Sequence, residues 1–283
     1  MPKTVLITGC SEGGFGAALA KEFHSRGYYV FATLRNTSKA GALADLENVE
    51  ILELDVTNLD DIARAAQAVA KHTGGTLDVL VNNAGADYVM PILDIKLEKA
   101  RQVLELNFWS VFNMTQAFAP LLIKAKGAIC NVSSTAAALP LAWSSMYSTA
   151  KAATRQFSEV MRVELGTLGV RVTTAMVGAM NTQVHVNSGE LKLPEDSYFQ
   201  CIKEGLAAQN RGDQKPGSHA PEVTAKRLVD DIVGGKVGET WRGGLASVVR
   251  YTAALLPQGI FEHLINGDKG LDIVQKAHKL KVQ

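Results

Sequence analysis

The chain has little net charge and few cysteines, and both shortages exclude functions. Its formal net charge is +1 over 283 residues, so bulk electrostatics gives no reason to expect a nucleic acid as partner. The three cysteines, Cys10, Cys130 and Cys201, are scattered, which is typical of reduced thiols in an intracellular protein rather than of a disulfide framework. The six histidines show no pairing with Cys, Asp or Glu at metal-ligand spacing, so no metal site is predicted.

Long apolar segments are also missing. At the N-terminus the first expected strand begins at once, with no apolar stretch after a charged start; this argues against a secretory signal and predicts a cytoplasmic protein. Near the C-terminus, Arg250 interrupts the apolar run 245–256, which is too short to span a bilayer. This run either packs on the sheet and the substrate pocket, which we favour, or forms an amphipathic surface that touches the endoplasmic reticulum or a lipid droplet.

What is present indicates a single α/β domain over 1–283. The chain is 47% hydrophobic and 20% charged, enough to bury one substantial core. Strand-like runs near 49–55, 77–83, 127–133 and 170–176 alternate with helical patterns near 59–72, 97–123 and 145–166. This alternation predicts a doubly wound parallel sheet with helices on both faces. The Gly- and Pro-rich stretch 183–221 is expected to be a flexible flap over the active site, and 222–283 a C-terminal helical extension.

A glycine-rich loop follows the first expected strand. The apolar run 3–8 leads directly into Gly9, and Gly13, Gly14 and Gly16 follow before a segment with helical character. Backbone N–H groups at the start of such a helix can face a phosphate, and the missing Cβ atoms allow a close approach. Taken alone, the loop is equally consistent with an ordinary strand–helix turn.

Tyr147 and Lys151 form the second chemical pattern. They lie four residues apart in an expected helix, so both side chains project from one face. A nearby ammonium favours the phenolate and is expected to pull the Tyr147 pKa towards the working range. The pair can then serve as a general acid or base. By itself it is also compatible with a packed tyrosine beside a solvated lysine.

Together these residues resemble the short-chain dehydrogenase/reductase family, whose fold is a Rossmann fold. Asn107 has the position of the family's active-site asparagine, and Ser134 lies thirteen residues before Tyr147, the family's usual offset for its catalytic serine. The resemblance implies the catalytic set Asn107, Ser134, Tyr147 and Lys151. It implies that the cofactor is bound by Thr8, Gly9, Ser11, Gly14, Phe15, Gly16, Arg35, Asp55, Val56, Asn83, Ala84, Gly85, Tyr147, Lys151, Gly178 and Thr182.

Two departures from the family pattern stand out. The glycine loop is one residue longer than the common spacing. The usual Pro-Gly after the sixth strand is replaced by Val177-Gly178, which leaves the rigidity of that loop open. Thr182, which in the family touches the nicotinamide amide, is in place.

Leu34 and Arg35 predict the choice of cofactor. Family members that prefer NAD carry an acidic residue just beyond the second strand, and Leu34 stands there instead. The neighbouring Arg35 suits a 2′-phosphate better than a neutral ribose, and Lys39 adds a second positive charge. NADP(H) is therefore the expected cofactor. Glu12 in the glycine loop argues weakly against it, because a carboxylate that points towards the 2′-phosphate would repel it.

The function implied is transfer of hydride to a ketone. Tyr147 would donate the proton, Ser134 would hold the carbonyl oxygen, Lys151 would lower the Tyr147 pKa and hold the ribose, and Asn107 would anchor a water. The C-terminal segment resembles fungal enzymes that reduce 1-acyl-dihydroxyacetone phosphate with NADPH. The expected partner is therefore a small-molecule hydrophobic ketone or alcohol, and the expected substrate is a hydrophobic or lipid-like ketone such as 1-acyl-dihydroxyacetone phosphate.

Two other functions stay open. One is a tailoring reductase or dehydrogenase of secondary metabolism, acting on a polyketide or terpenoid carbonyl; the other is a non-catalytic NADPH sensor. A substrate phosphate would need some of the available cations to converge on the pocket: Arg155, Lys192, Lys203, Arg211, Lys215 and Arg242. In the family, the helices expected near 97–123 and 145–166 form a two-fold interface, which predicts a homodimer or homotetramer.

Overall fold

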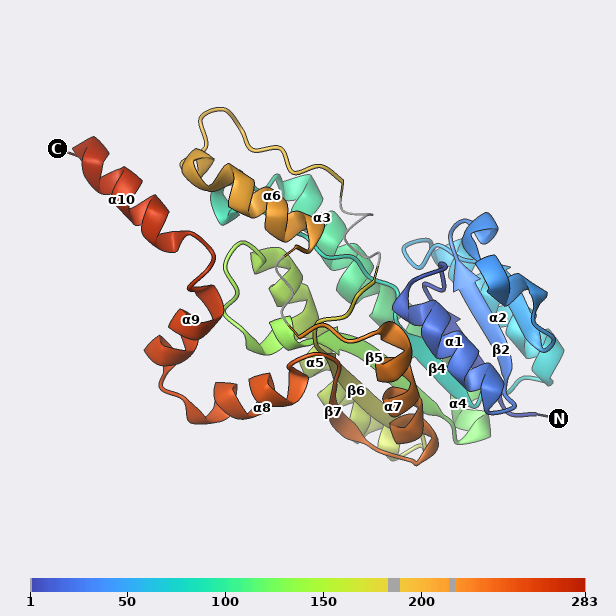
Figure 1. Cartoon of the computed structure of the whole chain (residues 1–283). Helices are drawn as coiled ribbons and strands as arrows, with labels where there is room; N and C mark the ends of the chain where they lie inside the picture. The colour runs from blue at the N-terminus through green and yellow to red at the C-terminus, as the bar shows by residue number, and fades with distance from the viewer. Residues whose placement is uncertain (1, 183–188, 214–216, 283) are drawn as a thin grey trace.

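The chain builds one parallel sheet between two layers of helices (Figure 1). The computed structural model describes residues 2–182, 189–213 and 217–282. Its strands are β1 Thr4–Thr8, β2 Tyr29–Leu34, β3 Val49–Glu53, β4 Val79–Asn82, β5 Ala128–Ser134, β6 Arg171–Val177 and β7 Gly238–Arg242. The sheet order is β3-β2-β1-β4-β5-β6-β7, and every neighbouring pair is parallel. The predicted doubly wound Rossmann sheet is confirmed.

Ten α-helices are found in the described ranges. They are α1 Phe15–Ser25, α2 Leu59–Thr73, α3 Leu97–Leu104, α4 Ser110–Ala125, α5 Ser145–Gly166, α6 Lys203–Arg211, α7 Pro221–Val233, α8 Ala246–Leu255, α9 Gln258–Asn266 and α10 Leu271–Val282. The single helix predicted near 97–123 is divided, because a π-helical turn over Glu105–Trp109 separates α3 from α4. A π turn inserts a residue into the helical repeat and is common at functional sites.

The two faces of the sheet carry separate apolar layers. On one face, α1 and α7 pack through Phe23 and Leu228 on strand residues that include Val5. On the other, α2, α4 and α5 pack through residues such as Phe118 on Leu6. Successive residues of one strand thus point to opposite layers. Burial on both faces explains why the strands are continuously apolar.

The carboxyl ends of the strands define one edge of the sheet, and the order reverses between β1 and β4. From β1 the chain proceeds outward to β2 and β3, then returns to β4 and continues through β7. In open parallel sheets, ligands bind in the crevice at such a switch point. A ligand site is therefore expected among the loops after β1, β4, β5 and β6.

The C-terminal extension contains β7 and four of the helices. Helix α8 buries Ala246 against Trp241 and Met176, as expected if the apolar run packs on the sheet. Its other face leaves Val248 and Tyr251 exposed. Figure 1 shows α9 and α10 continuing along the side of the molecule away from α1. None of the helices in the described residues is both long and apolar enough to cross a membrane.

Part of the predicted flap over 183–221 is folded and packed against the rest of the chain. Leu191, Ile202 and Leu206 are buried together with Val89, and α6 forms within this segment. Residues 183–188 and 214–216 of the predicted flap lie outside the described residues. The flexibility of 183–221 remains a prediction.

Candidate active site

A cavity of about 790 Å³ lies at the carboxyl edge of the strands. It is lined by most of the predicted residues: Gly9, Ser11, Gly14, Phe15, Arg35, Val56, Asn83, Ala84, Gly85, Asn107, Ser134, Tyr147, Lys151, Gly178 and Thr182. Three predicted cofactor residues, Thr8, Gly16 and Asp55, are not among its lining residues. The fold thus brings together motifs that are far apart in the sequence.

The loop after β1 is shaped for close contact by a phosphate. Gly9 has φ +77°, a conformation that favours glycine. Gly14 caps α1 with no side-chain hydrogen bond, and no acidic residue lies in the first helical turn. The helix therefore offers backbone N–H groups and a positive dipole end to an anion. A Cβ on Gly16 would lie 2.3 Å from the Gly9 oxygen, so Gly16 permits loop–helix packing instead of lining the cavity.

Thr8 and Asp55 do not line the cavity, but both form hydrogen bonds in the loops at its edge. Thr8 Oγ1 accepts hydrogen bonds from the backbone N–H groups of Asn83 and Ala84, both at 2.9 Å, and Asn83 Nδ2 donates to the Thr8 oxygen at 2.8 Å. Asp55 accepts from the Thr57 N–H at 2.9 Å. Thr8 thus joins the loops after β1 and β4, and Asp55 stabilises the turn after β3; neither residue lines the cavity itself.

One end of the cavity collects the residues that follow β2. Leu34, Arg35 and Lys39 line it together with Glu12 from the glycine loop. Arg35 is exposed, whereas Leu34 is buried at the end of the strand. The Glu12 carboxylate lies against Gly41, where a Cβ would come within 2.3 Å of it. This end therefore holds two cations and one acid.

The four predicted catalytic residues converge at the other side of the glycine loop. Ser134 is the last residue of β5, Tyr147 and Lys151 lie on α5, and Asn107 lies in the π-helical turn. The Lys151 Nζ donates to the Val132 oxygen at 3.0 Å and lies 5.8 Å from the centre of the Tyr147 ring. The side chain of Ser134 is hydrogen-bonded to Tyr147. The tetrad is thus assembled by three separate elements.

Asn107 is fixed by the loop after β4. Its Nδ2 donates to the oxygens of Ala86, at 3.1 Å, and Val103, at 3.0 Å, while its backbone oxygen accepts from Thr154 Oγ1 at 2.8 Å. A Cβ on Gly85 would lie 2.7 Å from Asn107 Oδ1 and 3.2 Å from Lys151 Nζ. Glycine at 85 therefore leaves room for both side chains beside the loop. Ser133, the neighbour of Ser134 in β5, donates to the Lys151 oxygen at 2.9 Å.

Burial governs the charges at this centre. It raises the pKa of Tyr147 well above its ordinary range; the charge of Asp87 raises it further, and the hydrogen bond with Ser134 lowers it. Burial also lowers the pKa of Lys151 to about 8, against an opposing effect of Asp87. The predicted lowering of the Tyr147 pKa by Lys151 was wrong for this structure, because desolvation of the phenolate is the larger effect. Tyr147 is held as the neutral phenol, the form that donates a proton.

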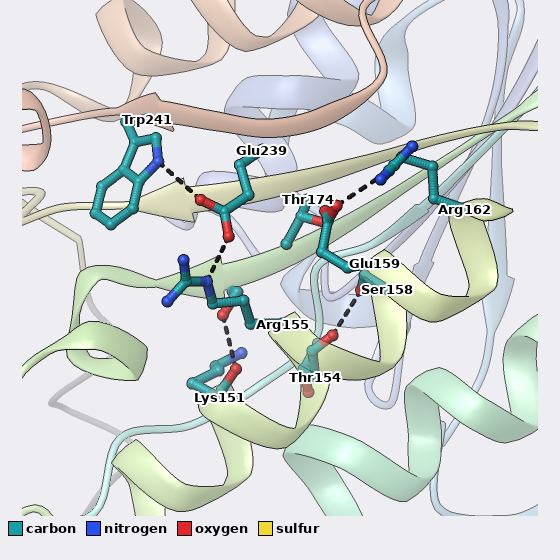
Figure 2. A network of polar contacts seen from close by, with 10 residues as sticks. Lys151, Thr154, Arg155, Ser158, Glu159, Arg162, Thr174, Glu239 and Trp241 are labelled. Carbon is teal, nitrogen blue, oxygen red and sulfur yellow. Dashed lines mark hydrogen bonds and ion pairs between the residues drawn. The ribbon is translucent and has the colours of Figure 1, made fainter. Parts of the chain in front are cut away.

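Helix α5 is clamped to the sheet by a row of polar contacts (Figure 2). Arg155 forms an ion pair with Glu239 of β7, which also accepts from Trp241 Nε1 at 3.2 Å. One turn further, Glu159 accepts from Thr174 Oγ1 of β6 at 2.8 Å. These contacts hold the helix that carries Tyr147 and Lys151 against the sheet. Arg155 is engaged in an ion pair with Glu239 and does not line the cavity.

The loop after β6 is held without the proline usual in the family. Gly178 donates to the Arg242 oxygen at 2.8 Å, and Ala179 and Gly244 exchange hydrogen bonds of 3.1 and 3.0 Å. Asn181 donates to the His219 oxygen at 3.0 Å. A Cβ on Gly178 would lie 2.1 Å from the Gly244 oxygen. The hydrogen bonds to Arg242 and Gly244 thus hold the loop after β6 in place, a question that the missing proline had left open.

The remaining side of the cavity is mainly apolar. Leu139, Leu141 and Met180 are apolar lining residues of the cavity that Tyr147 also lines. Several polar residues that also line the cavity were not predicted from the sequence, among them Asp87, Gln209 and Lys269. Asp87 could have been found from the sequence, because it closely follows the predicted cofactor-binding residues Asn83, Ala84 and Gly85. Nothing near Gln209 or Lys269 in the sequence indicates a site.

The cations considered for a substrate phosphate are located elsewhere. Arg242 pairs with Asp231 at 2.7 Å and Arg211 with Asp213 at 2.8 Å, while Lys192 lies 3.6 Å from Glu190. Neither these nor Arg155 and Lys203 line the cavity. Lys215 lies outside the described residues.

Comparisons with known proteins agree with this geometry. The model of the short chain dehydrogenase family matches residues 3–192. The short-chain dehydrogenase cctT of Talaromyces islandicus is 44% identical over 96% of this chain and 97% of its own. The NADPH-dependent 1-acyldihydroxyacetone phosphate reductase of Schizosaccharomyces pombe is 39% identical over 92% of this chain and 91% of its own. A short-chain dehydrogenase from Burkholderia cenocepacia, solved in complex with NADP, superposes with a TM-score of 0.72 at 27% identity, covering 93% of this chain and 96% of that one.

Proposed function

Since this chain belongs to the short-chain dehydrogenase family and is an NADP-dependent oxidoreductase, we propose that it reduces a hydrophobic ketone. The observation that carries the proposal is that the cavity lined by Tyr147 and Ser134 is also lined by the apolar residues Leu139, Leu141 and Met180. An apolar wall binds the body of such a substrate, and a few polar groups orient its carbonyl.

The cavity fits NADP(H) along its length. The uncapped start of α1 suits the pyrophosphate, and Arg35 with Lys39 suits the 2′-phosphate. Lys151, Gly178 and Thr182 also line the cavity, and they would bind the nicotinamide half. When bound, this cofactor supplies the hydride.

The chain's own residues supply the proton and the orientation. Tyr147, held as the phenol, donates its proton to the carbonyl oxygen. Ser134 hydrogen-bonds the same oxygen as negative charge develops there. Lys151 holds the ribose, and Asn107 orients the loop that covers Lys151. This intact set argues against a non-catalytic sensor, which would not need it.

Two substrate classes fit the wall. The similarity to the 1-acyldihydroxyacetone phosphate reductase supports a phosphorylated lipid ketone. The higher identity to fungal short-chain dehydrogenases of Talaromyces and Penicillium, 44% and 45%, supports the tailoring of a polyketide or terpenoid carbonyl as the second candidate.

An NADPH-consumption screen across acyl-dihydroxyacetone phosphate, steroid and polyketide ketones tests the proposal. We expect turnover with at least one long apolar ketone and little with its short-chain homologue. If every ketone leaves NADPH unconsumed while NADPH binds, the reductase proposal is wrong and the sensor role gains support.

NADPH binding should weaken as the pH rises through about 8. The pKa of Lys151 is lowered to about 8 by burial, so its ammonium is present below that pH and is lost above it. Loss of a charge-assisted hydrogen bond to the ribose should weaken affinity by roughly 10-fold. Fluorescence titration of NADPH on either side of this pH measures the effect. Adenosine 2′,5′-bisphosphate, which does not reach Lys151, is the control; if both ligands weaken equally, Lys151 is not responsible.

We propose that the protein forms a homodimer or homotetramer through α4 and α5. Trp109, Val160 and Val163 are 45%, 48% and 63% exposed, and the Trp109 and Phe112 rings lie 5.9 Å apart. An exposed aromatic and aliphatic face of this kind is typical of an association surface.

The double change Val160→Asp with Val163→Asp should convert the oligomer to monomer, because it places two charges in an apolar interface. Light scattering at micromolar concentration measures the mass. Val248→Asp on the exposed face of α8 is the matched control and should leave the mass unchanged. A monomeric wild-type protein would refute the assembly.

We also propose a peripheral membrane contact through α8 and α9, and with it a location at an internal membrane surface. Val248, Tyr251, Leu255, Ile260 and Leu264 are exposed on these helices, and exposed apolar helix faces can insert at the headgroup level. Co-sedimentation with phospholipid vesicles tests this; a protein that stays in the supernatant has no such contact.

A further inference from the structure

Ser144 is a buried serine of the cavity whose hydroxyl forms no hydrogen bond within the described residues. It is 2% exposed, it lines the same cavity as Tyr147 and Ser134, and it is the N-cap of α5. An N-cap serine normally accepts from the backbone N–H of the second or third helical residue, which here are Met146 and Tyr147. Ser144 makes no such bond. Its hydroxyl is therefore available to a ligand in the cavity.

Gln209 adds an amide against the same loop. It comes from α6 and also lines the cavity. Gln209 Nε2 donates to the oxygen of Ala142 at 3.3 Å, two residues before Ser144. A side-chain amide has two donor hydrogens and one acceptor oxygen, and this bond uses one of the hydrogens. The cavity thus receives a hydroxyl and an amide from one region of its wall.

The loop that carries Ser144 is held in place from two sides. The Ala142 N–H donates to Asn266 Oδ1 at 2.9 Å, and the Trp143 oxygen accepts from the Met90 N–H at 2.7 Å. Trp143 has φ +69°, a conformation that costs energy in a residue other than glycine. The position of Ser144 is therefore set by a fixed backbone and does not depend on a ligand to order it.

Apolar residues of the same loop, Leu139 and Leu141, also line the cavity. A purely apolar ketone would fill the space beside these leucines and would leave Ser144 and Gln209 without a partner. A second oxygen on the ligand would satisfy them. A site with buried polar groups discriminates strongly against an analogue that lacks the matching group, because those polar groups are then left unpaired.

We infer that Ser144 and Gln209 form a binding site for a second oxygen atom of the substrate, in addition to the oxygen of the reacting carbonyl. This rests on the proposed ketone reduction and deepens it: the preferred substrate is an apolar ketone that carries a further ether, ester, carbonyl or hydroxyl oxygen. Ser144 directly precedes the helix whose third residue is Tyr147, so the second oxygen lies within a few bonds of the carbonyl.

Matched pairs of ketones test this inference by binding alone. 1-Methoxy-2-nonanone and 4-undecanone differ only by an oxygen atom in place of a CH₂ group, one carbon away from the carbonyl. 1-Methoxy-3-decanone and 5-dodecanone differ in the same way, two carbons away. The first spacing is that of the ester oxygen in an acyl-dihydroxyacetone phosphate, and the second is that of a 1,3-dioxygenated polyketide.

Titration calorimetry against the full protein saturated with NADP⁺ measures these affinities, since the oxidised cofactor cannot reduce a ketone. We expect the wild type to bind the ether of at least one pair about 5-fold more tightly than its all-carbon partner. The pair with the larger difference identifies the spacing that the site recognises. Equal affinities within both pairs would overturn the inference.

Ser144→Ala removes the hydroxyl, so the preference for the ether should fall below about 2-fold, with binding of the all-carbon ketone and of NADP⁺ unchanged. Ser144→Thr keeps a hydroxyl and should retain the preference. Ser25→Ala, at the exposed end of α1, is the control and should behave as the wild type. If Ser144→Ala weakens both members of a pair alike, Ser144 is a packing residue and the inference is wrong.

Gln209→Leu tests the other half of the site and decides the question if Ser144→Ala does not fold. It removes the amide from a side chain of similar size, so the preference for the ether should fall while the all-carbon ketone binds as before. An unchanged preference in this variant would refute the paired site. Failure of every ketone in the NADPH-consumption screen, with the preference for the ether intact, would instead contradict only the proposed reaction.

Discussion

Tyr147→Phe should lower kcat by about 100-fold or more, because it removes only the transferable proton. The ring remains to pack between α5 and the cavity, so folding and the Kd for NADPH should stay close to the wild type. Steady-state kinetics with the best ketone of the screen, together with a fluorescence titration of NADPH, separate these two quantities.

Tyr251→Phe provides the matched control, since Tyr251 is an exposed tyrosine of α8 and should lose nothing. Lys151→Ala should combine a similar loss of turnover with weaker NADPH binding, because Lys151 serves both the reaction and the ribose. Turnover by Tyr147→Phe at the wild-type rate would remove Tyr147 from the role of proton donor and would leave Ser134 as the main polar contact to the carbonyl.

Replacing Leu34 by Asp and Arg35 by Ser should reverse the preference for NADPH over NADH. Arg35 and Lys39 line the end of the cavity beyond β2, and a charge-assisted hydrogen bond from Arg35 to the 2′-phosphate is worth about 1.5–3 kcal/mol. That corresponds to roughly 10- to 100-fold in kcat/KM. The double change removes this attraction, and the introduced carboxylate repels the phosphate while it can accept hydrogen bonds from the ribose. The measurement is kcat/KM for both cofactors in both proteins with one ketone.

Lys21→Ser, which removes an exposed cation from α1, controls for the general loss of positive charge and should keep the preference for NADPH. Because Leu34 is buried, thermal unfolding of the double variant must be measured alongside the kinetics. Equal use of NADH and NADPH by the unmodified protein would mean that Arg35 is only a surface cation and that Glu12 opposes the phosphate.

The sequence predicted the parts of the site that depend on local spacing. Tyr147 and Lys151 lie on one helical turn, and Ser134 ends the strand that precedes them, so their meeting follows from the helix repeat and from the parallel order of the sheet. The π-helical turn at Asn107 was not predicted, because no proline or glycine marks it. Its cause is tertiary: Asn107 is bonded to the loop at Ala86 and to Thr154 of α5.

Electrostatics and long-range docking were less predictable. The pKa of Tyr147 depends on how much water the folded site removes and on Asp87, neither of which a spacing of four residues reveals. Gln209 and Lys269 line the cavity from distant segments: Gln209 Nε2 itself donates to the Ala142 oxygen, and Trp143 and Asn266 join the turn that carries Lys269 to the loop at 140–143. Sequence distance gives no indication of such contacts.

The position of Gln209 also bears on how substrate choice can change in this family. The match to the family model covers residues 3–192, which contain all four predicted catalytic residues, whereas Gln209 and Lys269 line the same cavity from beyond it. The predicted catalytic residues and part of the cavity lining thus come from separate stretches of one chain. Exchange of the stretch after the catalytic core between relatives could then transfer a substrate preference and leave the hydride-transfer machinery untouched.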